Sequence, residues 1–260
     1  MISKYVNGKA EPNLYQQEVQ INTKTGKIAK VNLVFQDTKP EGSQVGNLVA
    51  VHGAPGTHKD FKYLNPILEE AGVRLIGVNW PGMGYSTYDE NLNDDNDERV
   101  QLVKHLVEEL KLGKNTVFMG HSRGSENALK MAALFKNDCA GCVLVNPVCL
   151  RPHRGIRPYS LVCLLGWMWK NLMFARLILN PFLHWLYNNV LGLRTSTGHS
   201  CGVSLHLMNH VDFGGQLQYI EAINDSNLKV LNCYSGKDFL VQRSLSRELG
   251  SKFKNSEDLV

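Results

Sequence analysis

A serine stands between two glycines in the segment GHSRG, residues 120–124, directly after the apolar run NTVFM. Small residues on both sides of Ser122 are what a tight strand-to-helix turn requires, and such a turn lifts the hydroxyl clear of a sheet. The next backbone amide, that of Arg123, then lies at a helix N-terminus, where it can stabilise an oxyanion. The pattern predicts that Ser122 is a nucleophile; a serine in a glycine-rich turn without chemistry is the simpler alternative. The residues expected to shape this turn are Gly120, His121 and Gly124.

A second glycine-rich loop, HGAPG at residues 52–56, follows the apolar run NLVAV. Opposite GHSRG, this loop would offer the backbone amide of Ala54 as a second oxyanion donor, facing the amide of Arg123. His52 and Gly53 would then support the loop. Loops that only connect strands also use glycine and proline, so the functional interpretation depends on the pairing with GHSRG.

Apolar runs and helical patterns alternate along most of the chain. The runs YQQEVQINT and IAKVNLVFQDT flank the turn KTGK and predict a hairpin. Helical spacing predicts a helix over 60–71, and a second helix begins near Asp94, Asp95 and Asp97, whose charges suit a helix N-terminus. The alternation predicts an α/β fold, with a mostly parallel sheet and helices on both faces. The loops HGAPG, WPGMG, GHSRG and NPV then fall beyond the carboxyl ends of the strands, where sites form in such sheets.

The alternation breaks over residues 148–226. A basic, proline-rich connector, RPHRGIRP, precedes the apolar run SLVCLLGWMWKNLMF. Asn180-Pro181 predicts a helix start, and a third helical pattern covers 204–223. Helices placed between two strands of a sheet predict an inserted lid. The predicted parts are therefore an α/β core over 1–147, a lid over 148–226 and the rest of the core over 227–260.

Composition narrows the functional classes. The net charge of +4, from 28 basic and 24 acidic residues, is too small to favour nucleic acid as a partner. The first residues carry no apolar stretch of a secretory signal, and six cysteines do not suggest a disulfide framework, so the expectation is a cytoplasmic protein. Cys139 and Cys142 form a CxxC at the start of an apolar run, which favours a structural role over a redox or metal site. No cofactor and no metal site is predicted.

Taken in order, these segments resemble the α/β-hydrolase superfamily. The resemblance rests on HGAPG, the turn WPGMGYS, GHSRG, NPV before the helical insertion and SGKD after a late apolar run. A serine at the elbow, rather than aspartate, implies ester, thioester or amide chemistry. The chain is most similar to a serine-nucleophile branch whose substrate is unassigned.

The resemblance also implies an acid after the late strand, and Asp238 in YSGKDFLV has that position. Its role would be to orient a histidine and stabilise the histidine's cation; an ordinary helix cap is the alternative. Three other aspartates fit the position less well: Asp89, Asp212 and Asp225.

The expected order of serine, acid and histidine stops at the acid, because no histidine follows Asp238. After Asp238 there remain 260 − 238 = 22 residues. A helix of ~11 residues, a strand of ~5 and their connections would need ~20–25, so the chain is expected to stop about where the last strand should begin. The C-terminal strand and helix are therefore expected to be missing, and the catalytic histidine to be absent from this chain. The substitutes considered fit less well: His52, His121, His153, His184, His199, His206 and His210.

Two functions follow. The first is a serine hydrolase that acts on an ester, thioester or amide of an apolar acyl group. The second is a catalytically inactive, hydrolase-like protein that binds such a ligand without turnover. An apolar ligand is suggested by aromatic residues in the predicted lid, although core packing explains them equally well: Trp167, Trp169, Phe174 and Trp185.

Two features of the predicted lid leave alternatives open. The run SLVCLLGWMW could dip into a membrane surface, but Lys170 and Arg176 interrupt the ~18 apolar residues of a span, and packing over an apolar pocket is the simpler account. A basic cluster at the lid entrance suits a substrate carboxylate or phosphate, or is a solvated connector: Arg151, His153, Arg154 and Arg157.

Overall fold

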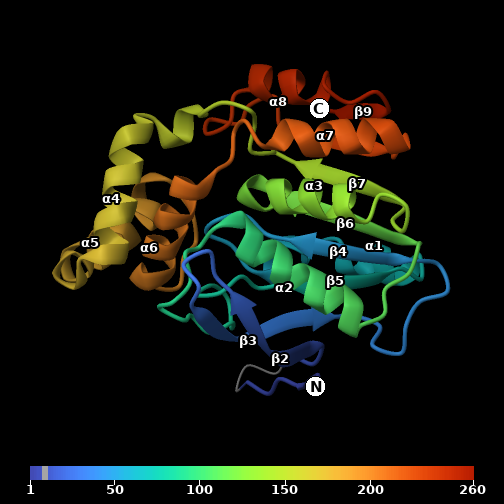
Figure 1. The fold of residues 1–260 in the computed structure, drawn as a ribbon, viewed down its shortest axis with the longest axis horizontal. Coiled ribbons are helices and arrows are strands. Elements are labelled where there is room, and N and C mark those ends of the chain that lie inside the picture. The colour runs from blue at the N-terminus through green and yellow to red at the C-terminus, as the bar shows by residue number, and fades with distance from the viewer. Residues whose placement is uncertain (8–10) are drawn as a thin grey trace.

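A mixed sheet forms the centre of the molecule (Figure 1). The computed structural model describes residues 1–7 and 11–260, and within them nine strands follow the order β1-β2-β3-β5-β4-β6-β7-β8-β9. From β4 to β9 all neighbours are parallel. The strands are β1 (Ser3–Lys4), β2 (Leu14–Asn22), β3 (Ile28–Asp37), β4 (Asn47–Val51), β5 (Arg74–Val78), β6 (Thr116–His121), β7 (Gly141–Val145), β8 (Val230–Cys233) and β9 (Ser256–Leu259).

The predicted α/β architecture is confirmed. β2 and β3 form the expected antiparallel hairpin, closed by the pair Asn22 and Ile28. β5 is buried along its whole length, which explains why only apolar residues and a glycine follow Arg74 in this strand. Cys142 lies buried in β7, so the CxxC segment enters a strand. Burial raises the pKa of the Cys139 thiol to about 11, which keeps it protonated at neutral pH.

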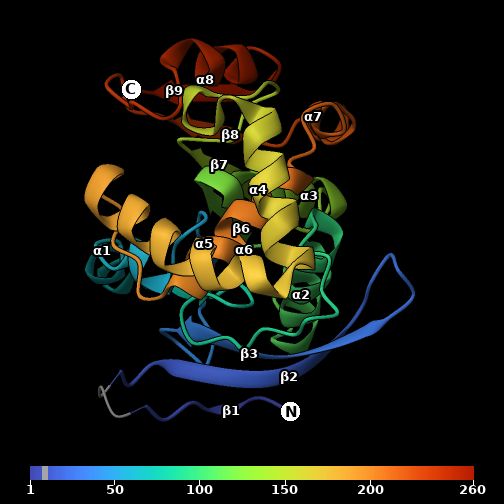
Figure 2. The same cartoon turned by 90° about the vertical axis from the view of Figure 1, so that its left-hand side faces the viewer.

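Helices cover both faces of the sheet (Figure 2). α1 (Asn65–Glu70) packs on one face beside β5. The other face carries a row of helices in contact with one another: α2 (Asn96–Glu109), α3 (Ser125–Leu134) and α7 (Gln216–Ser226). Asp95 caps α2 by accepting a hydrogen bond from the Glu98 amide at 3.0 Å, as the acidic run before this helix predicts.

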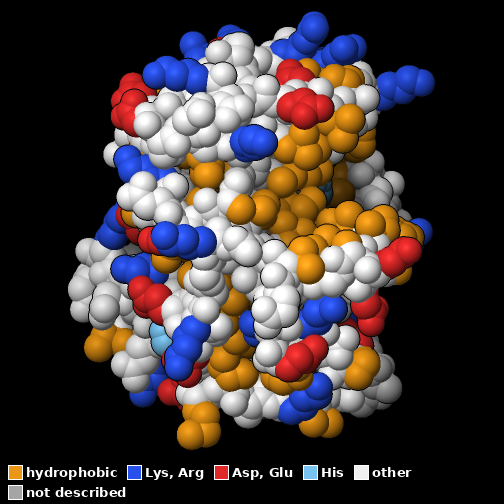
Figure 3. Space-filling model, turned by 90° about the vertical axis from the view of Figure 1, so that its right-hand side faces the viewer, with side chains coloured by type: hydrophobic (Ala, Val, Ile, Leu, Met, Phe, Trp, Pro, Cys, Tyr) orange, Lys and Arg blue, Asp and Glu red, His pale blue; other side chains and the backbone are white. Residues whose placement is uncertain are grey.

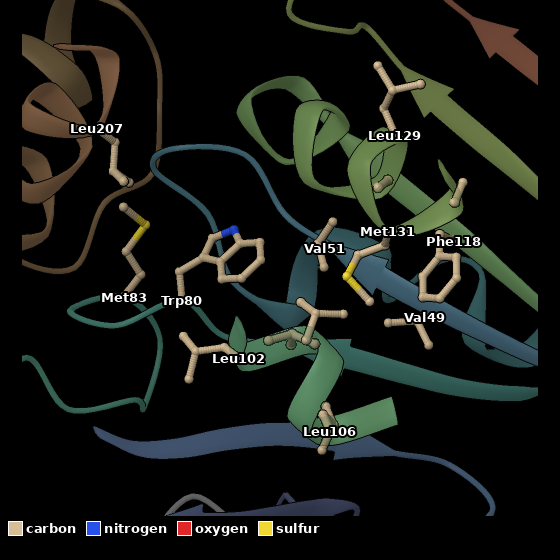
Figure 4. Packing of buried hydrophobic residues seen from close by; sticks show 14 of the residues in the cluster. Val49, Val51, Trp80, Met83, Leu102, Leu106, Phe118, Leu129, Met131 and Leu207 are labelled. Atoms are coloured by element: carbon tan, nitrogen blue, oxygen red, sulfur yellow. The ribbon is translucent and has the colours of Figure 1, made fainter. Parts of the chain in front are cut away.

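The main core lies between the sheet and this helical row (Figure 4). Val49 and Phe118, from two neighbouring strands, lie beside Met131 of α3, and Leu102 of α2 belongs to the same cluster of buried side chains. Each such side chain contributes about 1.5–3 kcal/mol when it leaves water. This packing fixes the strand from which the serine segment continues.

Three further helices lie together beyond the end of the sheet at which the parallel strands finish (Figure 1). They are α4 (Tyr159–Asn171), α5 (Met173–Trp185) and α6 (Gly198–Leu207), with a π-helical turn, η4 (Leu186–Val190), after α5. We call residues 150–211 the lid segment. The predicted division of the chain at residues 147 and 226 stays a prediction.

Two predicted helices have different boundaries in the structure. The helix expected over 60–71 is a 3-10 turn, η1 (His58–Phe61), followed by α1, because Pro66 has no amide hydrogen and begins a new helix. The helix expected over 204–223 is split into α6 and α7. Gly214 and Gly215 separate them, and the Gly215 amide donates to Asp212 at 2.6 Å instead of continuing a helix.

The helix start predicted at Asn180-Pro181 is wrong. Pro181 lies inside α5, which begins at Met173. The side chain of Asn180 does not cap a helix but accepts a hydrogen bond from the Trp169 indole at 2.8 Å. Buried Leu179 and Leu183 hold this part of α5 against the core, and their packing outweighs the hydrogen bond that proline removes.

The expectation that the C-terminal strand is missing is wrong as well. α8 (Arg243–Gly250) has only 8 residues, fewer than the expectation allowed, so the residues after it form β9, paired parallel with β8. The expectation about a further helix stays a prediction.

Candidate active site

The serine segment forms a strained turn between β6 and α3. Ser122 has φ of +49°, in the left-handed region that a residue with a side chain seldom adopts. A Cβ on Gly120 would lie 2.5 Å from the Gly124 carbonyl oxygen, and a Cβ on Gly124 would lie 2.4 Å from the Val51 carbonyl oxygen. Backbone therefore fills the space beside both glycines, and only glycine fits at either position.

We expect Gly124→Ala to destabilise the protein by about 2–3 kcal/mol, since the added methyl group meets backbone that cannot move aside. Gly113→Ala is the matched control, because a Cβ there has nothing within 4 Å. Urea unfolding of both variants measures the difference. Equal unfolding midpoints for the two variants would contradict the tight turn.

The loop after β4 touches this turn. A Cβ on Gly53 would lie 3.0 Å from the Cβ of Ser122, and Ala54 lines the same cavity as Ser122. His52 is fully buried, and both of its ring nitrogens are used: Nδ1–H donates to the Gly53 carbonyl at 2.6 Å, and Nε2 accepts from the Trp80 amide at 3.1 Å. Burial lowers the pKa of His52 to about 3. A neutral histidine with both nitrogens occupied holds the loop and cannot take a proton from serine.

Asp238 lies in the loop after β8 and lines this cavity too. Its Oδ1 accepts hydrogen bonds from the amides of Leu240 at 2.7 Å and Val241 at 2.9 Å, which orient the carboxylate. Within the described residues its other oxygen has no hydrogen-bond partner. The alternative aspartates lie elsewhere and do not line the cavity: Asp89, Asp212 and Asp225.

The cavity has a volume of about 370 Å³ and is walled mainly by apolar side chains. The lid segment supplies one wall: Val162, Tyr187, Leu191, Leu193, Leu205 and Met208. The aromatic residues singled out from the sequence are not part of it. Trp169 is buried against α5 and α6, while Trp167, Phe174 and Trp185 are exposed. The cavity has the size and lining that suit a small apolar group.

Two histidines line the cavity, His121 and His153. Among the described residues the Nδ1 of His121 has no hydrogen-bond partner, and it lies 4.0 Å from the Asp60 carboxylate. The Nδ1 of His153 lies 3.0 Å from the Leu240 carbonyl oxygen. Burial lowers the pKa of both histidines, and the negative charge of Asp238 partly offsets the effect.

In residues 1–7 and 11–260, no histidine hydrogen-bonds to Ser122 or Asp238. The remaining substitutes lie outside the cavity: His184, His199, His206 and His210. β9 finishes beside the acid loop, where the Tyr234 amide donates to the Leu259 carbonyl at 2.9 Å. A Cβ on Gly236 would lie 3.7 Å from Val260. The end of β9 therefore lies beside the loop that carries Asp238.

The side chain of Arg123 has a role that the sequence does not suggest. It is completely buried and pairs with Glu126 at 2.5 Å. It also donates to two carbonyl oxygens of the lid segment, Leu207 at 3.2 Å and His210 at 2.9 Å. The residue whose amide is the expected oxyanion donor thus also ties the lid segment to the serine turn.

The basic cluster of the connector does not converge on the cavity. Arg151 pairs with Glu248, and Arg157 donates to the Pro152 carbonyl at 2.8 Å. Of the cluster, His153 alone is among the residues that line the cavity in the described part of the chain. The geometry does not support a joint carboxylate or phosphate site in the connector.

Comparison with known proteins agrees with this geometry. Residues 11–259 match the model of a family described as alpha/beta hydrolase of unknown function (DUF1057). The chain belongs to this family. It is also 31% identical, over 255 residues, to an uncharacterized protein of Caenorhabditis elegans, F35H12.5, with 93% of this chain and 71% of that protein covered.

Solved structures share the fold of this DUF1057 member. An esterase from Thermogutta terrifontis superposes with a TM-score of 0.66 at 18% identity, over 94% of this chain and 89% of its own. An esterase from Exiguobacterium antarcticum gives 0.64 at 18% identity, over 93% and 90%. A bromoperoxidase from Bacillus anthracis gives 0.64 at 17% identity, over 94% and 90%. At this identity the likeness concerns the fold alone.

Proposed function

We propose that this α/β hydrolase is a serine hydrolase that cleaves an ester, thioester or amide of an apolar acyl group. The observation that carries the proposal is the strained turn at Ser122, which opens into an apolar cavity lined also by Ala54 and Asp238. A serine with a left-handed backbone conformation is strained, and such strain is typical of functional sites. The esterases among the structural neighbours support the same class of reaction.

In the proposed reaction the Ser122 oxygen attacks the acyl carbon, and the amides of Ala54 and Arg123 stabilise the oxyanion. A histidine, oriented by Asp238, takes the serine proton and passes it to the leaving group, which leaves the acyl group on Ser122. The same histidine then takes a proton from water, whose oxygen attacks the acyl carbon, and returns the proton to Ser122 as the acid is released. The described residues supply no histidine hydrogen-bonded to Asp238. We place the base in a residue that follows Val260 in a longer form of the protein, because β9 finishes beside the Asp238 loop.

The test is ester hydrolysis by the longest natural form of the protein, identified by its intact mass from the native source. We expect activity on p-nitrophenyl acyl esters that requires Ser122 and a histidine beyond Val260. A longer form that carries such a histidine but hydrolyses none of these esters would count against a hydrolase.

The two histidines of the cavity provide the discriminating variants. We expect His153→Gln and His121→Gln to keep kcat within about tenfold of the wild type, because neither ring hydrogen-bonds to Asp238. Loss of activity by about 10²-fold or more in either variant would indicate that the replaced histidine is the base. Circular dichroism of both variants controls for folding.

The unpartnered oxygen of Asp238 favours one second candidate, a hydrolase-like protein that binds an apolar ligand without turnover. This candidate predicts that a fluorescent fatty acid binds with equal affinity to the wild type and to Ser122→Ala. It leads if no natural form of the protein hydrolyses an ester.

A further inference from the structure

The lid segment exposes an apolar face as well as burying one. In α5, Phe174 is 80% exposed, Leu177 74% and Ile178 73%, while Leu179 and Leu183 of the same helix are buried. Phe182 and Trp185 continue the exposed stripe at helical spacing. Met173, the first residue of α5, is exposed as well, and further exposed apolar side chains lie before and after α5 in the same segment: Leu161, Leu164, Trp167, Leu172 and Val190.

Figure 2 shows α4 and α5 facing the viewer, at the outside of the molecule. Large apolar side chains exposed in such number on neighbouring helices mark a contact surface rather than ordinary surface variation. We call the exposed apolar residues of 161–190 the lid face. The size of the lid face suits a protein partner and a lipid partner equally. The charges around the lid face distinguish the two.

The lid segment contains no acidic residue. Six of the 28 basic residues of the chain fall within 150–211, and none of the 24 acidic residues does. The six are Arg151, Arg154, Arg157, Lys170, Arg176 and Arg194. A segment with one sign of charge and one apolar face matches a surface that is negatively charged and apolar beneath.

Three of these basic side chains point toward the rest of the protein. Arg176 pairs with Glu90 at 2.6 Å, Lys170 lies 3.7 Å from Asp94, and Arg151 pairs with Glu248. These ion pairs fix the lid segment on the core. Because these three basic side chains point toward the core, their ion pairs do not cover the lid face.

The other three basic residues have no carboxylate partner in the described part of the chain, although Arg157 also donates to the Pro152 carbonyl. Arg154 and Arg157 precede α4, and Arg194 follows η4; all three are exposed. In the described part of the chain none of them lies within ion-pair distance of a carboxylate. The charges on the opposite side of the molecule are of both signs. Hydrophobic side chains line a hollow there, and both acidic and basic side chains border it (Figure 3).

We propose that the lid face rests on an anionic lipid surface. The apolar stripe of α5 enters the boundary between headgroups and acyl chains, and the indoles of Trp167 and Trp185 lie at the headgroup level. Arg154, Arg157 and Arg194 bind lipid phosphates and carboxylates. No described helix has the length and apolar character needed to span a bilayer, so the contact is with the surface.

The tryptophans provide a direct readout. Two of the 4 tryptophans of the chain, Trp167 and Trp185, are 49% and 54% exposed on the lid face, while Trp80 and Trp169 are fully buried. Indole emission shifts to shorter wavelength when the ring leaves water, so vesicle binding shifts the emission of the exposed pair. We expect this emission shift with phosphatidylcholine vesicles that contain about 30% phosphatidylserine. The shift is expected to be weaker with vesicles of phosphatidylcholine alone.

Matched variants separate the apolar and charged contributions. Phe174→Asp/Ile178→Asp is expected to weaken vesicle binding by at least about 100-fold, because two exposed apolar side chains no longer enter the lipid. Arg154→Gln/Arg194→Gln is expected to weaken binding to the anionic vesicles by roughly 30-fold and to abolish the preference for them. Tyr63→Asp/Ile67→Asp, which replaces exposed apolar residues near α1, is the control and keeps wild-type binding.

Ser122→Ala is expected to bind the vesicles like the wild type, so lipid binding and hydrolysis fail or succeed independently. Absence of an emission shift and of co-sedimentation with both vesicle types would overturn the proposal. So would a concentration-dependent dimer, abolished by Phe174→Asp/Ile178→Asp, without lipid binding, because a second copy would then cover the lid face.

Discussion

Replacing Ser122 with alanine is expected to lower kcat for ester hydrolysis by at least about 10⁴-fold in the form of the protein that carries the base. The alanine has no oxygen to attack the acyl carbon, whereas the two backbone amides and the apolar cavity stay in place. Binding of an apolar ligand is therefore expected to change little. Steady-state kinetics and displacement of a fluorescent fatty acid measure the two effects separately.

Asp238→Asn tests the partner role at the same site. The asparagine oxygen can still accept the hydrogen bonds from Leu240 and Val241, so the loop keeps its shape. Loss of the negative charge is expected to lower kcat by about 10²–10⁴-fold with little change in binding. Ser244→Ala, on the exposed side of α8, is the neutral control. Full activity in Ser122→Ala would remove the serine mechanism.

Replacing Arg123 with methionine is expected to cost about 3–5 kcal/mol of unfolding free energy. The Arg123 side chain is fully buried, and its loss removes the hydrogen bonds to Glu126 Oε2 and to the Leu207 and His210 carbonyl oxygens, while Asn96 still donates to Glu126 Oε1 and to the His210 carbonyl. Removing one partner of a buried ion pair lowers the free energy of unfolding more than replacing both partners with apolar residues does. The double variant Arg123→Met/Glu126→Met is therefore expected to recover part of the lost free energy.

An exposed ion pair provides the comparison. Lys104 and Glu108 lie 3.7 Å apart at successive turns of α2, with 55% and 59% of their side chains exposed. Lys104→Met is expected to change stability by no more than about 0.5 kcal/mol, because water screens this pair. Urea unfolding of all the variants gives the values. A loss in Arg123→Met as small as that of Lys104→Met would show that the buried pair does not anchor the lid segment.

The sequence by itself determined the sheet, the hairpin and the serine turn. The alternation of short apolar runs with helical patterns is a local property, and the structure confirms the strands of the parallel sheet from β4 to β8. The glycines on both sides of Ser122 are also a local requirement, since the space that excludes a side chain belongs to the turn and to the strand beside it. Local rules sufficed where each segment's own spacing and size fixed its conformation.

Helix boundaries in the lid segment depended on packing across the fold. Asn180-Pro181 has the composition of a helix start, yet Leu179 and Leu183 are buried and carry α5 through the proline. Likewise, α8 is short enough to leave room for β9, which chain length alone did not reveal. Sequence rules for helix ends describe an isolated segment, and tertiary contacts of a few kcal/mol override them.

Only the tertiary structure decided which side chains meet at the cavity. It brings Ser122, Ala54 and Asp238 to one cavity, gives Arg123 its contacts with the lid segment, and places His153 beside Asp238's loop. It also turns Trp167, Phe174 and Trp185 outward and buries Trp169 in the core, so none of the four lid aromatics lines the cavity. These partners are separated by tens of residues in the chain, and a short stretch of sequence carries no record of which distant surface its side chains will touch.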